Sequence, residues 1–157
     1  MCNIFEISLK WIRSKEFTYE EFNRDHTVVL GNNQTIYNSA AIDYFGDSDK
    51  TNPEELLMSA LASCHMLTFL VIASKSGYVV DSYTDRPNAI LEKNEEHKMV
   101  IATINLRPLI EFSGTKIPDA LQLKSLHDKA HRNCFIANSI KSKVIVHTPG
   151  ESHESTR

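Results

Sequence analysis

The sequence predicts an α+β domain built from two runs of strand-like sequence and two helical patterns. The strand-like segments follow one another instead of alternating with helices, which disfavours a parallel doubly wound sheet. A long apolar segment separates the two runs, and a second helical pattern lies near the C-terminal end. The 157 residues fit one domain with a sizeable core. We therefore expect a single domain over residues 1–147 and a polar, disordered tail over 148–157.

The N-terminal run predicts three strands. Residues 4–12 alternate apolar and polar side chains, as a half-buried strand does. Two further strands are expected at 26–31 and 34–39, because they flank the triplet Gly31-Asn32-Asn33, which can supply the positive φ angles of a tight hairpin. Between the first and second strands, residues 16–25 predict a charged turn region.

A long helix is expected after this run. Asn52 is a favourable N-cap, Pro53 suits the first helical position, and Glu55 stands three residues after the cap, as in a capping box. Nearly every residue of 56–73 is apolar or small, so we expect this helix to be buried on most of its surface. A membrane span is the rival interpretation, but 18 residues are at the short limit for crossing a bilayer. Four polar side chains in the segment also favour a core helix: Ser59, Ser63, His65 and Thr68.

The C-terminal half predicts more strands, a helix and a closing strand. Residues 79–92 and 99–112 are rich in Val, Ile, Tyr and Thr, and residues 94–97 between them favour a hairpin. A helix is expected to begin near Pro118, because apolar residues beyond it recur at helical spacing. A short helix around Cys134 and a strand over 143–147 complete the expected elements.

Charge and cysteine content limit the classes of function. The formal net charge of −3 leaves no surplus of cations for binding a polyanion, so nucleic acid is not expected as a partner. The N-terminal residues lack the basic leader and continuous apolar core of a signal peptide, which predicts a cytoplasmic protein with no membrane association. In a reducing compartment, three cysteines favour packing, metal binding or transient catalytic oxidation over permanent disulfides. Cys2 lies in no motif.

Cys64 lies in the middle of the expected long helix. Its position on an apolar stripe is also that of a small buried hydrophobic residue, the usual situation of a free cysteine. A mid-helix thiol lacks the helix N-terminus that lowers the pKa of many reactive cysteines, so a reactive Cys64 needs a cation or donor from elsewhere. Arg24 is our candidate for that cation, and Arg13 is the second choice.

Three features together resemble the OsmC/Ohr family of thiol-dependent hydroperoxide reductases. They are the motif Asn52-Pro-Glu-Glu-Leu, the position of Cys64 ten residues after Glu54, and the motif Ala130-His131-x-x-Cys134. The resemblance extends from about Leu9 to His147 and includes the order of the elements. It implies an OsmC-like fold, with antiparallel sheets packed around a long buried central helix.

The resemblance also implies an activity and roles for particular residues. Cys64 would be the peroxidatic cysteine, Cys134 would resolve its sulfenic acid as a disulfide, and Glu54 would be the acidic residue of the family motif. Arg24 corresponds by approximate position to the arginine that some members take from the N-terminal hairpin region. The implied enzyme is a peroxidase of oxidative-stress defence that reduces organic hydroperoxides, uses dithiols of the lipoyl type as reductants and needs no cofactor.

The spacing of Glu54 and Cys64 adds a geometric expectation. Ten residues of continuous helix separate two side chains by about 15 Å along the helix axis, so these two cannot meet within one chain. If both serve one site, either the helix breaks or the glutamate comes from a neighbouring subunit. We predict the second arrangement, an entwined two-fold homodimer with each site built across the interface.

Two other functions remain open. His127, His131 and Cys134 have the spacing of one helix face, and Cys64 could complete a tetrahedral zinc site in a metal-binding or structural protein. A non-catalytic, ligand-binding member of the same fold is the other alternative. An apolar pocket suits either a hydroperoxide or another ligand, and its candidate lining residues are Met58, Met66, Phe69 and Phe135.

Overall fold

The computed structural model describes residues 2–148, which fall into two compact units. The first unit ends at Leu57 and the second begins at Met58, so the boundary lies inside the long helix α1 (Pro53–Lys75). The expected C-terminal tail lies outside the described residues except for Thr148.

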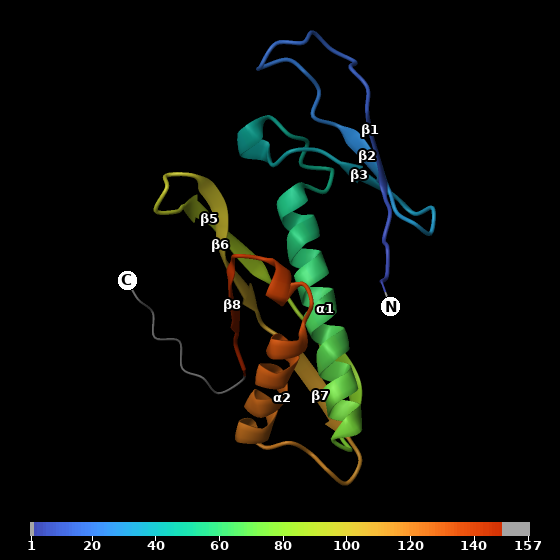
Figure 1. Ribbon diagram of the computed structural model, residues 1–157, viewed down its shortest axis with the longest axis vertical. Coiled ribbons are helices and arrows are strands. Elements are labelled where there is room, and N and C mark those ends of the chain that lie inside the picture. Colours follow the sequence, from blue (N-terminus) through green and yellow to red (C-terminus); the bar gives the residue numbers. More distant parts are fainter. Residues whose placement is uncertain (1, 149–157) are drawn as a thin grey trace. The chain divides into compact units, whose positions relative to one another are not determined.

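The N-terminal unit contains a three-stranded antiparallel sheet (Figure 1). Its strands are β1 (Ser8–Trp11), β2 (His26–Val29) and β3 (Thr35–Asn38), in the order β1-β2-β3. Asn33 has a φ of 64°, as the hairpin prediction requires. The first strand is shorter than the predicted 4–12, because its pairing ends where Ser8 meets Val29, the last residue of β2. A short 3-10 helix, η1 (Ile42–Tyr44), follows the sheet.

Helix α1 begins as the sequence predicts. The backbone N–H of Glu55 donates to Oδ1 of Asn52 at 2.9 Å, and the N–H of Asn52 donates to Oε2 of Glu55 at 3.2 Å. These reciprocal bonds form the expected capping box and satisfy donors that the helix itself leaves unpaired. The helix then runs without a break for 23 residues to Lys75.

The expected burial of α1 on most of its surface is wrong for the single chain. The buried side chains form one stripe at intervals of four residues: Leu61, His65, Phe69 and Ala73. On the opposite side, Leu67 is 56% and Val71 53% exposed. By length and composition alone α1 could cross a membrane. Its buried stripe instead contributes Phe69 and Ala73 to a protein core.

The C-terminal unit contains two small sheets. Strand β4 (Val79–Thr84) pairs antiparallel with β7 (Leu109–Ser113), and β5 (Asn88–Lys93) forms the expected hairpin with β6 (Met99–Leu106). Strand β8 (Lys143–Val146) pairs parallel with β6, so this edge departs from the predicted antiparallel sheets.

Each predicted long strand of this unit is two strands. Pro87 separates β4 from β5, and Pro108 separates β6 from β7. Proline has no N–H to donate to a ladder, which explains why both strands stop there. The two halves then join different sheets, β4 with β7 and β5 with β6.

Helix α2 (Ala120–Asn133) packs beside the C-terminal half of α1 (Figure 1). Asp119 is its N-cap and forms a capping box with Gln122, which confirms the predicted start near Pro118. Leu126 and Ala130 of α2 join Phe69 and Ala73 in one buried cluster. A short 3-10 helix, η2 (Ala137–Ser139), leads from α2 toward β8.

Candidate active site

The two cysteines predicted to react with each other are neighbours in the C-terminal unit. Cys64 lies on α1 and is half-buried, whereas Cys134 follows the last residue of α2 and is fully buried. Both are free thiols, and the thiol of Cys134 donates a hydrogen bond to the sulfur of Cys64. Residues seventy positions apart in the sequence are thereby joined into one pair.

Hydrogen bonds favour the thiolate form of Cys64. Burial by itself would raise the pKa of Cys64, but donors around its sulfur outweigh burial and hold this pKa below the ordinary value. The donors are the thiol of Cys134, the backbone N–H groups of Ile136 and Phe135, and the hydroxyl of Thr68. The Thr68 hydroxyl has one proton, and it donates this proton to the carbonyl oxygen of Cys64 at 2.8 Å; it reaches the sulfur only by rotating.

Cys134 has the opposite tendency. Burial raises the pKa of Cys134 to about 11, and its hydrogen bond to Cys64 favours the protonated form further. The N–H of Ala137, which donates to Sγ of Cys134 at 3.4 Å, only partly offsets these effects. Cys64 is therefore the more acidic thiol of the pair, and Cys134 is the one that keeps its proton.

The predicted short helix around Cys134 is absent, and with it the geometry of the zinc alternative. Helix α2 ends at Asn133, and Cys134 has extended backbone angles of φ −75° and ψ 115°. Cys134 therefore does not share a helix face with His127 and His131. Within residues 2–148, no three His, Cys, Asp or Glu side chains gather in an arrangement that could hold a metal ion. The structure thus gives the zinc alternative no support.

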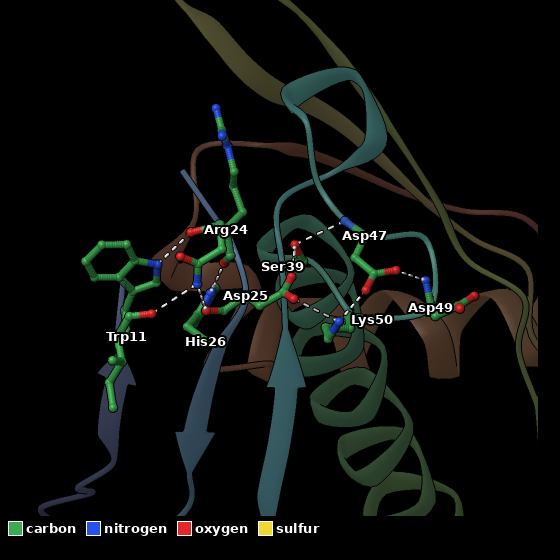
Figure 2. A network of polar contacts seen from close by, with 10 residues as sticks. Trp11, Arg24, Asp25, His26, Ser39, Asp47, Asp49 and Lys50 are labelled. Atoms are coloured by element: carbon green, nitrogen blue, oxygen red, sulfur yellow. Dashed lines mark hydrogen bonds and ion pairs between the residues drawn. The ribbon is translucent and has the colours of Figure 1, made fainter. Parts of the chain in front are cut away.

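Arg24 lies in the N-terminal unit, in the turn region before β2. Its guanidinium donates to the carbonyl oxygens of Phe22 and Tyr19 and lies over the Phe22 ring, 3.7 Å from the ring centroid. Figure 2 shows the Arg24 side chain extending away from the ion pair between Asp25 and Lys50. Among the described residues Arg24 forms no ion pair with a carboxylate. The contacts of its guanidinium are with carbonyl oxygens and an aromatic ring of the same loop.

A polar network that the sequence does not predict fixes this loop (Figure 2). The ammonium group of Lys50 lies 3.0 Å from Oδ2 of Asp25 and also pairs with Asp47. Ser39 donates to Oδ1 of Asp25 at 2.9 Å and accepts from the N–H of Asp47 at 3.1 Å. The network holds Asp25, the residue next to Arg24. In the sequence, its charged residues indicate only a turn.

An aromatic cavity of about 390 Å³ lies beside Arg24 in the same unit. Arg24 is the one residue in its lining that always carries a charge. Four aromatic side chains line the cavity: Trp11, Phe17, Phe22 and His26. The cavity can accept an apolar group next to a cation.

Glu54 lies in the first turn of α1. Its Oε2 atom is buried and forms no hydrogen bond with any residue that the structure describes, Arg24 included. Because α1 is continuous from Pro53 to Lys75, Glu54 and Cys64 of one chain are about 15 Å apart along the helix axis. The structure thus joins Cys64 to Cys134 within the C-terminal unit, and Glu54 and Arg24 lie in the N-terminal unit.

Residues 46–148 match the family model described as OsmC-like protein. The chain belongs to this family. An OsmC-like protein of unknown function from Vibrio cholerae is 38% identical, with a TM-score of 0.88, and the match covers 93% of this chain and 99% of that protein. The family match confirms the resemblance found in the sequence and the OsmC-like α+β fold. No curated protein matches the chain.

More distant OsmC-like structures share the fold. An organic hydroperoxide resistance protein from Legionella pneumophila has a TM-score of 0.66 at 16% identity, covering 93% of this chain and 95% of that one. A putative organic hydroperoxide resistance protein from Vibrio cholerae, with captopril bound in one of its active sites, has a TM-score of 0.68 at 18% identity. That match covers 93% of this chain and 91% of the Vibrio protein.

The expected apolar pocket is only partly present in this OsmC-like protein. Phe69 is fully buried and stacks on His127, so it belongs to the core, and Met58 packs in the core cluster around Leu61. Phe135 is 81% exposed and lines a groove of about 450 Å³. The rest of that groove is formed by Leu67, Thr68, Val71, Ile72, Lys75 and Asn133.

Proposed function

We propose that this OsmC-like protein is a thiol-dependent peroxidase that reduces organic hydroperoxides to alcohols in oxidative-stress defence. The observation that carries the proposal is the unequal pair of free thiols. Cys64 is half-buried with a lowered pKa, and the buried Cys134 donates to it with a raised pKa. A purely structural pair of cysteines has no need of several donors around one sulfur.

The proposed first step is a nucleophilic displacement. The Cys64 thiolate attacks the distal oxygen of the hydroperoxide, the O–O bond breaks, and the departing alkoxide takes up a proton to become an alcohol. Cys64 is then a sulfenic acid, oxidised by two electrons. The Cys134 thiol can supply this proton, because it already donates a hydrogen bond to Cys64.

The second step forms a disulfide. The Cys134 sulfur attacks the sulfenic sulfur of Cys64, the S–O bond breaks, and the hydroxyl leaves as water with a proton. The disulfide prevents oxidation to sulfinic acid, and an external dithiol, which the family resemblance suggests is of the lipoyl type, restores both thiols. No cofactor takes part. A cytoplasmic location fits this cycle, because the reductants are kept reduced there.

We propose further that Glu54 and Arg24 act across an entwined two-fold homodimer. The length of α1 between Glu54 and Cys64 supports a glutamate from the partner's helix, which would orient the Arg24 guanidinium toward Cys64. The apolar side chains that α1 exposes around Leu67 and Val71 are suited to pack against a second copy, which would place the groove that they also line at the edge of that interface. The unpartnered Oε2 atom of Glu54 leaves one carboxylate oxygen for such a contact.

The names of two distant relatives support the choice of substrate class. The proteins from Legionella pneumophila and Vibrio cholerae are named for organic hydroperoxide resistance, and the latter holds an organic molecule in one active site. The apolar groove beside Thr68 and Phe135 suits the organic part of such a substrate.

Peroxide consumption by the purified protein tests the proposal. We expect tert-butyl hydroperoxide to be consumed faster than hydrogen peroxide, and a lipoyl system to sustain turnover better than a thioredoxin system. Cys64→Ser should abolish consumption, whereas Cys134→Ser should form one trappable sulfenic acid per chain without sustained turnover. If Cys64 reacts with neither peroxide, the protein is a non-catalytic, ligand-binding member of the fold.

A further inference from the structure

A buried pair of imidazoles links α1 to α2 beside the two cysteines. His65 is 0% and His127 is 2% exposed. Nε2 of His65 lies 3.1 Å from Nδ1 of His127, so one ring donates a hydrogen bond and the other accepts it. The two ring planes are only 5° apart, and the Phe69 ring stacks on His127 at 4.5 Å between centroids. Packing and one directional bond therefore fix the geometry of the pair.

This pair fills the core less favourably than apolar side chains would. Nδ1 of His65 and Nε2 of His127 are buried, and neither forms a hydrogen bond with any residue that the structure describes. Two apolar residues of similar volume would carry no such unsatisfied nitrogens. An apolar pair lacks direction, however, whereas a hydrogen bond weakens steeply when its angle falls below about 120°. The imidazole pair thus contributes more to the relative orientation of α1 and α2 than to the net stability of the fold.

The orientation that it fixes bears directly on the thiol pair. His65 is the next residue after Cys64 on α1, and His127 lies on the helix that Cys134 terminates. A rotation of α1 by one residue, about 100°, would break the contact between the imidazoles and turn Cys64 away from Cys134. A disulfide tolerates little such error, because its sulfur atoms must come within about 2.05 Å at a narrow range of dihedral angles.

We propose that His65 and His127 are positioning residues that fix the rotation of α1 against α2 and thereby set how readily Cys64 and Cys134 form a disulfide. This role serves the resolving step of the proposed peroxidase and rests on that function for its biological purpose. The equilibrium between the two thiols and their disulfide nevertheless involves no peroxide chemistry. It can be measured without any peroxide.

Glutathione redox buffers provide that measurement. The two protein thiols give two electrons and two protons to glutathione disulfide; the Cys64–Cys134 bond forms as the S–S bond of glutathione disulfide breaks to give two glutathione thiols. Each protein is equilibrated at graded ratios of glutathione to its disulfide, quenched with acid and alkylated. Mass spectrometry then counts the free thiols and gives the equilibrium constant.

Three variants separate positioning from packing. His65→Leu/His127→Leu removes the hydrogen bond and keeps much of the volume. His65→Gln/His127→Asn keeps a bond between the same positions, because the Gln amide nitrogen, near the place of Nε2, can donate to the Asn amide oxygen, near the place of Nδ1. Leu126→Ala is the packing control, because it opens a cavity in the cluster of Phe69 and Ala130 and leaves both imidazoles in place.

We expect the double leucine variant to lower the disulfide equilibrium constant about tenfold, within the range of coupling between packed neighbours. The amide variant and Leu126→Ala should stay within about threefold of the unmodified protein. The proposal is overturned if the leucine variant keeps the original constant, if Leu126→Ala lowers it equally, or if the amide variant fails to preserve it. Circular dichroism verifies folding, and His127→Leu against His127→Asn makes the same comparison if the double leucine variant does not fold.

The outcomes also distinguish this inference from the proposed function. A protein that shows the expected equilibrium constants but consumes no hydroperoxide contradicts the peroxidase and leaves the positioning role intact. Peroxide consumption with equilibrium constants that do not depend on the imidazoles contradicts the positioning role alone.

Discussion

At the scale of single residues, the environments of the two cysteines assign their roles. Donors around Cys64 favour its thiolate, and burial of Cys134 favours its thiol. The sequence could identify both cysteines but not this asymmetry, because the donors come from residues 135–136 and from Cys134 itself, which only the fold brings to Cys64. The contact between His65 and His127 escaped prediction for the same reason. Neither histidine lies in a motif that indicates the other.

The pKa of Cys64 should depend on the donor at position 134. Cys134→Ala removes the strongest of the donors that lower the pKa of Cys64, so we expect this pKa to rise. Cys134→Ser keeps a hydroxyl donor and should raise the pKa less. Ultraviolet thiolate absorbance as a function of pH measures both shifts. Equal pKa values in the two variants would mean that Cys134 is not the donor.

The buried histidines should make the protein sensitive to acid. Burial lowers the pKa of His65 to about 4 and that of His127 to about 3, from an ordinary value of 6.5. Between pH 6.5 and these lowered pKa values, the two histidines bind more protons in the unfolded chain than in the native one. The resulting stability is complete above about pH 6.5 and is lost as the pH falls toward about 4 and 3, by up to about 1.4 kcal/mol per pH unit for each histidine.

Urea denaturation at several pH values measures this effect. The variant His65→Gln/His127→Asn keeps a polar pair that does not titrate, so its free energy of unfolding should fall less between about pH 6.5 and 4 than that of the unmodified protein. Carboxylates contribute equally to both curves. Parallel curves would show that the two histidines do not titrate as a buried pair.

At the scale of elements, local sequence predicts where the helices begin and where the hairpins turn. The capping box at Asn52 and the turn at Asn33 follow from residues within a few positions of each other. The pairing of β4 with β7 and the parallel approach of β8 to β6 depend on residues far apart in the chain. No local pattern encodes such pairings, so these parts of the fold could not be predicted.

Gly46 offers a test of one tightly packed loop. A Cβ atom at this position would lie 1.6 Å from the carbonyl oxygen of Ala40, so the backbone would have to move. We expect Gly46→Ala to destabilise the protein by about 1–3 kcal/mol, the usual cost of overpacking. Gly31→Ala is the matched control, because its Cβ would meet the carbonyl oxygen of Glu6 at an ordinary 3.5 Å. Thermal denaturation compares the two, and similar melting temperatures would contradict the packing of this loop.

At the scale of the whole molecule, the proposed site needs two chains. The sequence places Glu54 and Cys64 on one helix, and the unbroken α1 excludes the alternative in which that helix breaks between them. The exposed apolar residues on α1 leave a surface for a second copy. An experiment with mixed chains can decide whether the site is shared.

Glu54→Gln and Cys64→Ser should each be inactive alone and active when combined. If each site takes Glu54 from one chain and Cys64 from the other, a mixed dimer carries one doubly altered site and one intact site. Co-refolding equal amounts should therefore restore about a quarter of the original peroxidase activity. Refolding either variant by itself is the control. No recovery in the mixture, with mixed dimers verified by mass, would place both residues in the same chain's site.

The complete burial of Cys134 gives the oxidised protein a single point of entry for reducing equivalents. An incoming thiol can approach only the sulfur of Cys64, so the transient mixed disulfide belongs to Cys64, and Cys134 is the group released. In the proposed cycle, the same burial that keeps Cys134 away from peroxide therefore directs the reductant to Cys64.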